Sequence, residues 1–424
     1  MLYLYRKHLT LYRKHVFIIK TDVFVTNTSD EKVGDLMKKI PLIGKIIIAL
    51  IIGIGAGILC KSLNILFPIR ILATFSGVFS NFLSFIIPLI IVGFIVPGIA
   101  TLGKKSGKGL LITTVIAYIS TLGAGLLAFI IGKLFLSRFI SSVGSLGEEG
   151  VTITPYFTID IDPLMGVMSA LVFAFVMGIG IASLKNSTIL KVAEEFNEIV
   201  LGIITKVLIP IVPIYIGCVF AKMSFSGEIF NTLKSFAIVY VILFSLQLIY
   251  ILIQYLIAGT IKKENPLKLI KNMLPAYMTA LGTQSSAATI PVTLQCVSKN
   301  NVSEEVTDFV VPLAATIHLA GDTMTLVLTA MGVMYMNGQT PTFGLILPFI
   351  FMLGVTMIAA PGVPGGGVMA ALGLLESMLG FGTVEKPIMI ALHAAQDSFG
   401  TATNVTGDGA IAIIVDYIIK KKNK

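Results

Sequence analysis

Two short polar stretches interrupt very apolar sequence in the last third of the chain, at residues 283–289 (TQSSAAT) and 397–408 (DSFGTATNVTGD). Carboxylates such as Asp397 and Asp408 are costly inside a lipid bilayer, so those found in apolar segments usually mark a substrate or ion pathway. Polar interruptions of this kind also indicate broken helices, from which secondary transporters build their binding sites. The pattern therefore favours a membrane carrier.

The first stretch, called the serine tip below, offers groups that bind an anion. Where two half-helices meet, the N–H groups at a helix N-terminus are unpaired and carry partial positive charge. They can bind a carboxylate without a cationic side chain. Ser285 and Ser286, which follow Gln284, would add hydroxyl donors. The alternative is a serine-rich turn in a loop.

A glycine-rich run at residues 361–367 (PGVPGGG) can be interpreted in the same way. Its glycines allow close backbone approach to a ligand and the movement of a gate. This places Val363 and Gly367 near the ligand.

The second stretch places acceptors for cations on one helix face. Asp397, Thr401 and Asn404 are spaced i, i+4 and i+7, so they lie on the same side of a helix. Asp397 can pair with a substrate ammonium group, while the other two add hydrogen bonds. Asp408, one turn further, could bind a cation together with carbonyl oxygens freed by the broken helix. The alternative is a set of interhelical hydrogen bonds that hold the bundle together.

A related polar run at residues 315–322 contains His318 and Asp322, four residues apart. They could form a satisfied internal ion pair or a proton-binding site.

The composition excludes an ordinary soluble domain, because 55% of the residues are hydrophobic, 12% are charged and the mean hydropathy is +0.94. Although the net charge is +9, the lysines and arginines lie mostly in short loops between apolar segments. That distribution is typical of the cytoplasmic loops of membrane proteins and not of a nucleic-acid-binding face.

Apolar segments of the length that crosses a bilayer, about 20 residues, fall near residues 40–60, 72–102, 108–136, 163–184, 196–221 and 231–260. Basic loops alternate with the acidic stretch 138–162, which predicts that both termini are cytoplasmic. Residues 1–38 would form a cytoplasmic N-terminal extension of unknown role, unless Met37 is the true start. Residues 419–424 would form a basic cytoplasmic tail.

After residue 265 the apolar segments become shorter. Residues 267–283 and 287–297 flank the serine tip, and the second arm is about 16 Å long as a helix, half the hydrocarbon thickness. A re-entrant hairpin therefore fits better than a full crossing, and residues 342–360 and 368–381 repeat it around the glycine-rich run. Each hairpin precedes a long helix that is expected to break at its polar run. The first would enter from the cytoplasm and the second from outside, as inverted repeats with the site at their interface.

In these residues the chain resembles the dicarboxylate/amino acid:cation symporter family, the glutamate-transporter group, over about residues 40–418. The serine tip with residues 289–293 (TIPVT), residues 363–365 (VPG) and residues 404–408 (NVTGD) match in order and spacing. The resemblance implies an all-α polytopic membrane protein with eight transmembrane helices, two re-entrant hairpins and a homotrimeric assembly. It also implies a transport core at residues 266–418 that moves as an elevator against residues 39–265, which are mostly scaffold.

The resemblance also implies roles for single residues. The two serines of the serine tip would hold the substrate α-carboxylate, and Asp397 would bind the α-amino group beside Thr401 and Asn404. Asp408 and the backbone of Asn404 match one sodium site. Members that carry acidic substrates have an arginine on the last helix or at the first hairpin tip, where this chain has Gly400 and Gln284.

Without those arginines an anionic side chain would be buried unpaired, at a cost of several kcal/mol. We therefore expect a small neutral amino acid such as serine, threonine or alanine. The family's Asn-Met-Asp-Gly-Thr motif reads His318-Leu-Ala320-Gly-Asp322, which removes a carboxylate of another sodium site. Asp322 stands where the family has a substrate-facing threonine: protonated it would bond a hydroxyl, and ionised it would favour a cationic side chain. With His393 nearby, proton coupling is also open, so uptake would use Na⁺, H⁺ or both.

Other functions fit less well. The same fold could carry a cationic amino acid, cystine or a dicarboxylate. A passive channel could also use broken helices, but paired hairpins and an ammonium-binding carboxylate favour a carrier. An intramembrane aspartyl protease would need Gly-x-Gly-Asp, whereas Leu319 and Val405 occupy the first-glycine positions. We therefore expect a multi-pass plasma-membrane carrier with no enzymatic activity.

Overall fold

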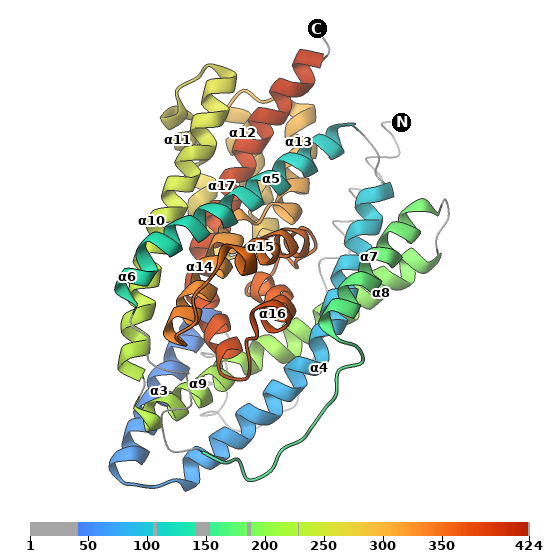
Figure 1. Cartoon of the computed structure of the whole chain (residues 1–424). Coiled ribbons are helices and arrows are strands. Elements are labelled where there is room, and N and C mark those ends of the chain that lie inside the picture. Colours follow the sequence, from blue (N-terminus) through green and yellow to red (C-terminus); the bar gives the residue numbers. More distant parts are fainter. Residues whose placement is uncertain (1–40, 105–107, 141–152, 185–187, 228, 423–424) are drawn as a thin grey trace, which may run out of the picture. The chain divides into compact units, whose positions relative to one another are not determined.

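The computed structural model describes residues 41–104, 108–140, 153–184, 188–227 and 229–422, and within these ranges it has helices, turns and loops but no β-strand (Figure 1). The predicted N-terminal extension at residues 1–38 lies outside the described residues. The same holds for the acidic residues 148 and 149 of the predicted outer loop.

Seven helical stretches within the described ranges are long and apolar enough to cross a bilayer. They are α3 (Leu42–Ser62), α4 (Phe67–Lys104), α5 (Lys108–Ile131) with η1 (Gly132–Leu136) and α6 (Ser137–Phe139), α8 (Thr188–Ile203) with η2 (Ile204–Leu208) and α9 (Ile209–Ser226), α10 (Ile229–Lys262), α13 (Glu304–Ile317) with α14 (Ala320–Met336), and α17 (Glu385–Lys422). The shorter apolar helix α7 (Val167–Ser183), with 17 residues, gives the eighth crossing. The predicted all-α polytopic fold with eight crossings is confirmed.

Four short helices form the two predicted hairpins. The first consists of α11 (Pro266–Thr283) and α12 (Ser286–Lys299), and the second of α15 (Phe343–Ile358) and α16 (Gly366–Leu379). Their arms have 14 to 18 residues, or about 21–27 Å of helix, and the two arms of each hairpin pack against each other, so each pair returns toward the end of the bundle where it starts.

Local sequence explains the sharp turn of the first hairpin. Helix α11 ends at Thr283, and its C-cap residue Gln284 has a left-handed φ of 52°, which reverses the chain. Ser285 then caps α12, because its side chain accepts a hydrogen bond from the backbone N–H of Ala288 at 3.3 Å. The serine tip is thus a helix C-cap followed directly by an N-cap, which leaves the N-terminus of α12 at the hairpin apex.

The two hairpins approach the middle of α17 from opposite ends (Figure 1). Near the C-terminal end of α17, Asp416 accepts a hydrogen bond from the hydroxyl of Ser303, which follows the first hairpin. Near its N-terminal end, Lys386 binds Glu376 of α16 at 2.9 Å. Hairpins that enter from opposite sides confirm the predicted inverted arrangement.

The polar run of α17 does not break the helix. Helix α17 is continuous over 38 residues, so the predicted interruption at residues 397–408 is wrong. Thr403 and Thr406 donate hydrogen bonds to the carbonyl oxygens of Phe399 and Ala402, at 2.9 and 2.7 Å, which satisfies their hydroxyls within the helix. The other predicted break is confirmed, because α13 ends at Ile317 and α14 begins two residues after His318.

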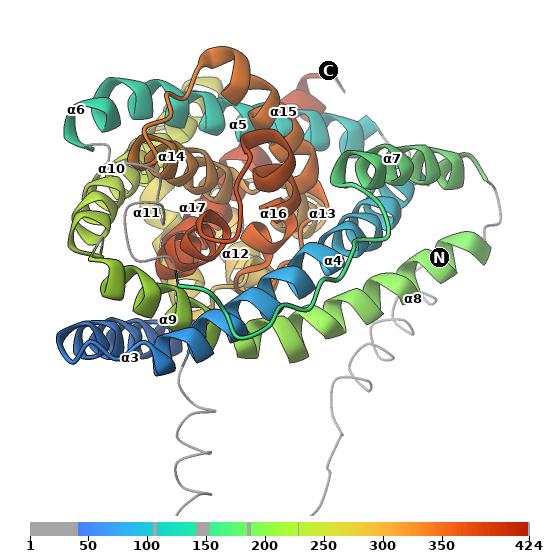
Figure 2. The same cartoon turned by 60° about the horizontal axis from the view of Figure 1, so that its bottom comes forward.

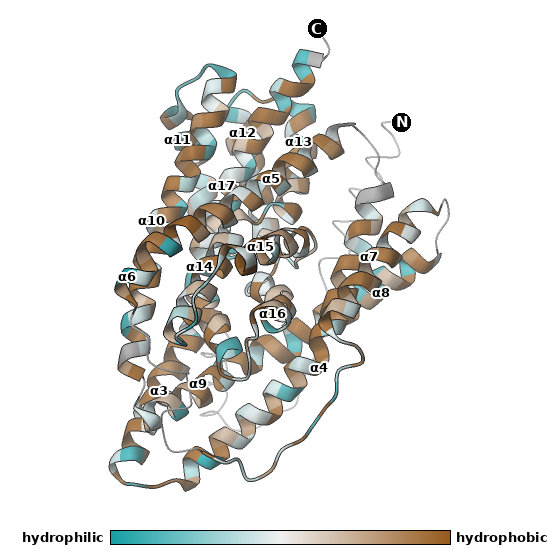
Figure 3. Cartoon of the chain, viewed as in Figure 1, coloured by the Kyte–Doolittle hydropathy of each residue, from teal (hydrophilic) through white to brown (hydrophobic). Residues whose placement is uncertain are grey.

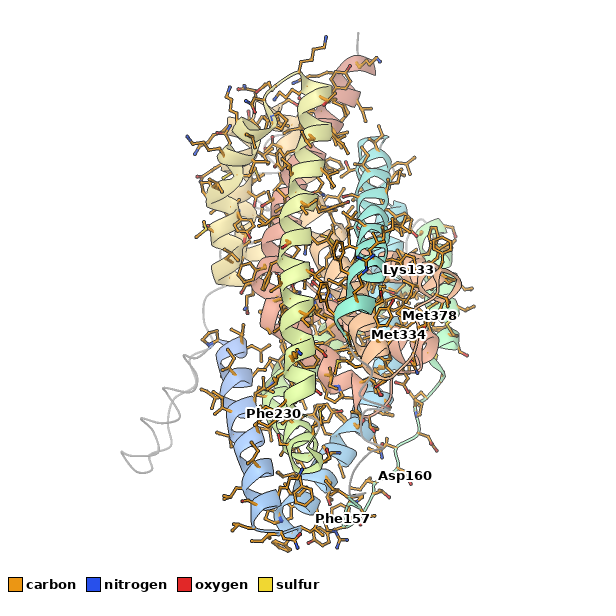
Figure 4. All side chains as sticks on the ribbon, turned by 60° about the vertical axis from the view of Figure 1, so that its left-hand side comes forward. Lys133, Phe157, Asp160, Phe230, Met334 and Met378 are labelled. Carbon is orange, nitrogen blue, oxygen red and sulfur yellow. The ribbon has the colours of Figure 1, made fainter. Side chains whose placement is uncertain are left out.

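Helices α3, α4, α8 and α9 form a layer beside the group made by the two hairpins, α14 and α17 (Figure 2). Helices α3, α4 and α9 are mostly hydrophobic, as expected for residues that face lipid (Figure 3). Helix α8 also carries the exposed charged residues Lys191, Glu194, Glu195 and Glu198. The loop that carries Phe157 and Asp160 lies at the end of the described helices opposite to the C-terminal end of α17 (Figure 4). That end also carries Arg70, which donates a hydrogen bond to the carbonyl oxygen of Thr154 in the same loop.

Small residues let α3 and α9 pack closely. A Cβ added at Gly53 would lie 2.2 Å from the carbonyl oxygen of Gly217, and one added at Gly57 would lie 2.3 Å from that of Ala221. Close contact through small residues is a main source of helix association in membranes.

We expect Gly53→Val to destabilise this layer, because two methyl groups would overlap the backbone of α9, at a typical cost of about 1–3 kcal/mol. Gly55→Val is the matched control on the same helix, since no atom lies within 4 Å of its added Cβ. Thermal unfolding in detergent measures both variants. Equal midpoints for the two would show that the α3–α9 contact is not a tight one.

Candidate functional site

A small cavity lies where the two hairpin tips meet α14 and α17. Its volume is about 20 Å³, little more than a water molecule needs. Eight of the residues predicted to bind substrate line it: Gln284, Ser286, Asp322, Val363, Gly367, Asp397, Thr401 and Asn404. Residues that are up to 120 positions apart in the sequence are thus brought together, as predicted, although their roles stay predictions.

The cavity is closed by direct contact between the tips. Ser285 Oγ donates a hydrogen bond to the carbonyl oxygen of Gly362 at 3.0 Å, and Gln284 Nε2 donates to Ser398 Oγ at 2.9 Å. The volume is too small for an amino acid, so the two tips are in contact over a nearly filled site.

Two of the predicted binding residues lie outside the cavity lining. The hydroxyl of Ser285 forms the hydrogen bond between the tips and also caps α12. Gly400 lies at the crossing of α14 and α17, where a Cβ added at Gly321 would be 2.4 Å from the carbonyl oxygen of Gly400. The missing side chain of Gly321 lets the two helices approach each other, whereas a Cβ added at Gly400 would meet only Gln396 of its own helix, at 3.2 Å.

Asp397 is buried and faces the second hairpin. Its Oδ2 accepts a hydrogen bond from the backbone N–H of Gly365 at 2.8 Å. Among the residues that the structure describes, no lysine, arginine or histidine forms an ion pair with it. The carboxylate thus has capacity for a positively charged ligand on the cavity side.

Asp322 is held from two sides. Its Oδ1 lies 2.7 Å from His393 Nε2, and its Oδ2 accepts a hydrogen bond from the side-chain amide of Asn404. Asn404 Oδ1 in turn accepts from the backbone N–H of Gly321 at 2.7 Å, at the start of α14. This network joins the two long helices beside the cavity.

His318 and Asp322 do not form the internal ion pair considered from the sequence. The helix break between them removes the i, i+4 relation, and His318 Nδ1 instead lies 2.9 Å from Asp408 Oδ1. Both side chains are buried, and His318 Nε2 is 3.0 Å from Ser120 Oγ on α5. The pair lies outside the cavity lining.

The residues predicted to hold a cation are therefore divided between two networks. Asn404 contacts Asp322, whereas His318 contacts Asp408. A different group could hold a metal ion by geometry, because one ligand atom each from Asp322, His393 and Asp397 lie within 4.8 Å of one another. Two members of that group already bond each other, so we interpret it as part of the polar cavity wall.

Sequence reasoning missed the partners contributed by α5 and α10. Gln254 of α10 donates to Ser120 Oγ at 3.0 Å, and Ser120 contacts His318. Neither residue belongs to a polar run that would have drawn attention to it. The link between His393 and Asp322 was also not predicted, although His393 shares a helix face with Asp397 at i−4.

We expect Gly367→Ala to weaken ligand binding about 10- to 100-fold, the equivalent of 1–3 kcal/mol of overpacking. Its added Cβ would lie 2.9 Å from Asp322 Oδ1 and 3.2 Å from His393 Nε2, so the cavity wall would have to shift. Gly362→Ala is the control on the same tip, because its Cβ meets only Ala287 at 3.8 Å. Calorimetric titration of both variants with serine measures the difference. If both bind as tightly as the unmodified protein, Gly367 does not contribute through close packing.

Comparison with known proteins gives a consistent result. A model of the sodium:dicarboxylate symporter family matches residues 42–418. Excitatory amino acid transporter 1 of Ambystoma tigrinum is 29% identical over 263 residues, which are 60% of this chain and 47% of that protein. The human protein of the same name is 28% identical over 267 residues, 61% and 48% of the two chains. An excitatory amino acid transporter of Caenorhabditis elegans is 29% identical over 262 residues, 60% and 52%. The aligned part spans about half the length of these relatives.

Proposed function

The chain belongs to the sodium:dicarboxylate symporter family, and we propose that it is a secondary active carrier that couples cation influx to uptake of a small neutral amino acid. The family and the relatives are transporters and not enzymes. The driving cation is Na⁺, H⁺ or both, and the substrate resembles serine, threonine or alanine.

The observation that carries this proposal is the opposition of charges across the cavity. On one side lies the buried carboxylate of Asp397, which has no ion-pair partner among the described residues. On the other lie Ser286 and the N-terminus of α12, which offers unpaired N–H groups and partial positive charge. A zwitterion with an ammonium and a carboxylate group satisfies both sides at once.

The choice of a neutral side chain rests on the cavity lining, which contains two aspartates and no lysine or arginine. An anionic side chain would meet like charges without a cation to pair with. A cationic substrate or cystine is the alternative through Asp322. It is less favourable because both oxygens of Asp322 already have partners in His393 and Asn404.

The arrangement also bears on the other candidate classes. Asp322 and Asp408, the two acids considered for an aspartyl protease, do not share a site, because each pairs with a different histidine. Asp322 and Asp397 do line one cavity, but Ala394 and Gln396 stand where Gly-x-Gly-Asp would need glycines before Asp397. A channel needs a continuous pore, whereas the tips close over the cavity. Alternating access to an enclosed site is the behaviour of a carrier.

Transport by an elevator movement of residues 266–418 within a homotrimer is part of the proposal. The short hairpins enclose the site within one group of helices, and α3, α4, α8 and α9 form a separate layer that can serve as the scaffold (Figure 2). The basic C-terminal end of α17 and the opposite position of Asp160 support cytoplasmic termini (Figure 4). The membrane proposed for this carrier is the plasma membrane.

Uptake by purified protein in proteoliposomes tests the function. Serine, threonine and alanine are expected to accumulate against their gradients when an inward sodium or proton gradient is imposed. Lysine, cystine and glutamate are the competitors that separate the alternatives. Strong preference for glutamate would contradict the proposed specificity for neutral amino acids. Uptake in which the internal concentration never exceeds the external one would indicate a channel.

A further inference from the structure

The family implies sodium, yet the residues around Asp408 do not form a sodium site. A hard cation needs several oxygen ligands directed at one point. The sequence predicted that these oxygens would come from the Asp408 carboxylate and from backbone carbonyls freed by a break in α17. Because α17 is continuous, the carbonyl oxygen of Asn404 accepts the backbone N–H of residue 408 within the helix instead.

The imidazole of His318 lies where a cation would have to bind. Its Nδ1 is 2.9 Å from Asp408 Oδ1, so a nitrogen meets the carboxylate oxygen that would be the first ligand. Asp408 Oδ2 and Gln254 Oε1 have no hydrogen-bond partner among the described residues, but two side-chain oxygens do not make up the coordination shell of a hard cation.

The ring of His318 has polar contacts at both of its nitrogens. Its Nε2 lies 3.0 Å from Ser120 Oγ and 3.4 Å from Gln254 Nε2, which tie it to α5 and α10. A Cβ added at Gly407 would lie 2.6 Å from His318 Cε1, so the ring is packed directly on the backbone of α17. Withdrawing the ring would leave the buried Asp408 carboxylate without its partner, whereas Ser120 and Gln254 would still bond each other.

We propose that His318 occupies the position of a sodium ion at Asp408, so that this carrier binds no sodium there. The proposal rests on the proposed function only in treating the protein as a cation-coupled carrier. Any sodium dependence of transport must then arise at another site. The difference between this position and a sodium site is local, because it follows from one side chain that contacts Asp408.

The experiment is thermal unfolding of the full chain in detergent without any amino acid, in sodium chloride and in choline chloride at equal ionic strength. Ligands that bind only the folded state raise the unfolding midpoint. We expect the sodium-induced change in midpoint to be the same, within about 1 °C, for the unmodified protein and Asp408→Asn. Asp416→Asn, on the same helix but bonded to Ser303 and Lys420, is the matched control. A sodium-induced rise that Asp408→Asn loses and Asp416→Asn keeps would overturn the proposal.

A second variant keeps the test decisive if Asp408→Asn does not fold. His318→Asn removes the ring and adds an amide oxygen beside Asp408. It is expected to gain a sodium-induced rise of about 2 °C or more that the unmodified protein lacks. The double variant His318→Asn with Asp408→Asn should lack that gain. If His318→Asn responds to sodium no more than the unmodified protein, the ring is not what excludes the ion. Because no substrate is present, these outcomes do not depend on which amino acid is carried. The uptake experiment could therefore fail without changing the result of this sodium test.

Discussion

Asp397→Asn is expected to lower the affinity for a neutral amino acid by at least about 100-fold, near 3 kcal/mol. Asparagine keeps the shape of the side chain and can still accept the N–H of Gly365, so the second hairpin should fold as before. What it removes is the negative charge opposite the substrate ammonium group. A buried ammonium without a counter-charge typically costs about 3–5 kcal/mol, so the loss should appear in binding and not only in transport.

Calorimetric titration of the purified variant with serine measures this effect directly. Asp416→Asn is the control, because it lies on the same helix but bonds Ser303 and Lys420 near the C-terminal end. It should bind serine normally. Unchanged affinity in Asp397→Asn would show that the ammonium group binds elsewhere.

The hairpins could be predicted from the sequence because their length limits them. Arms of 14 residues cannot span the hydrocarbon, and the caps at Gln284 and Ser285 are local features of the chain. The break at His318 could be predicted for a different reason, because the polar run there ends one helix and starts another. These features depend on neighbours in sequence, so they are visible without tertiary contacts.

The continuity of α17 could not be predicted in this way. A run with two glycines, three threonines and an asparagine resembles a helix break, but its polar groups find partners within the folded bundle. Thr403 and Thr406 bond their own helix, and Asn404 bonds α14. Since these partners exist only after folding, composition alone indicated the wrong backbone.

The candidate site divides along the same line. Asp397, Thr401 and Asn404 were placed on one face by helical spacing, and all three line the cavity. The pairing of the histidines was not predictable, because His318 and Asp322 are close in sequence yet bind different partners. Spacing fixes which side chains share a face, whereas the crossing of helices decides which of them meet.

Asp322→Ala is expected to destabilise the protein by about 3–5 kcal/mol, because it leaves two buried polar groups without their common partner. His393 would lose the contact of its Nε2, and its Nδ1 already has no partner among the described residues. Asn404 would lose an acceptor for its amide at the crossing of α14 and α17. The substrate site should suffer with the fold, since these side chains form its wall.

A double-mutant cycle with His393→Ala separates the pair from the rest of the network. If the contact between the two side chains matters, removing both should cost less than the sum of the single changes, with a coupling of about 1–3 kcal/mol. The reason is that the second truncation removes a group that the first had already stranded. The cycle Asp322→Ala with Asp416→Ala is the control and should be additive, because Asp416 bonds a different part of α17. Additivity of the His393 cycle within about 0.5 kcal/mol would mean that Asp322 acts through Asn404 alone. The cavity wall would then be stabilised by the amide of Asn404 and not by the imidazole of His393.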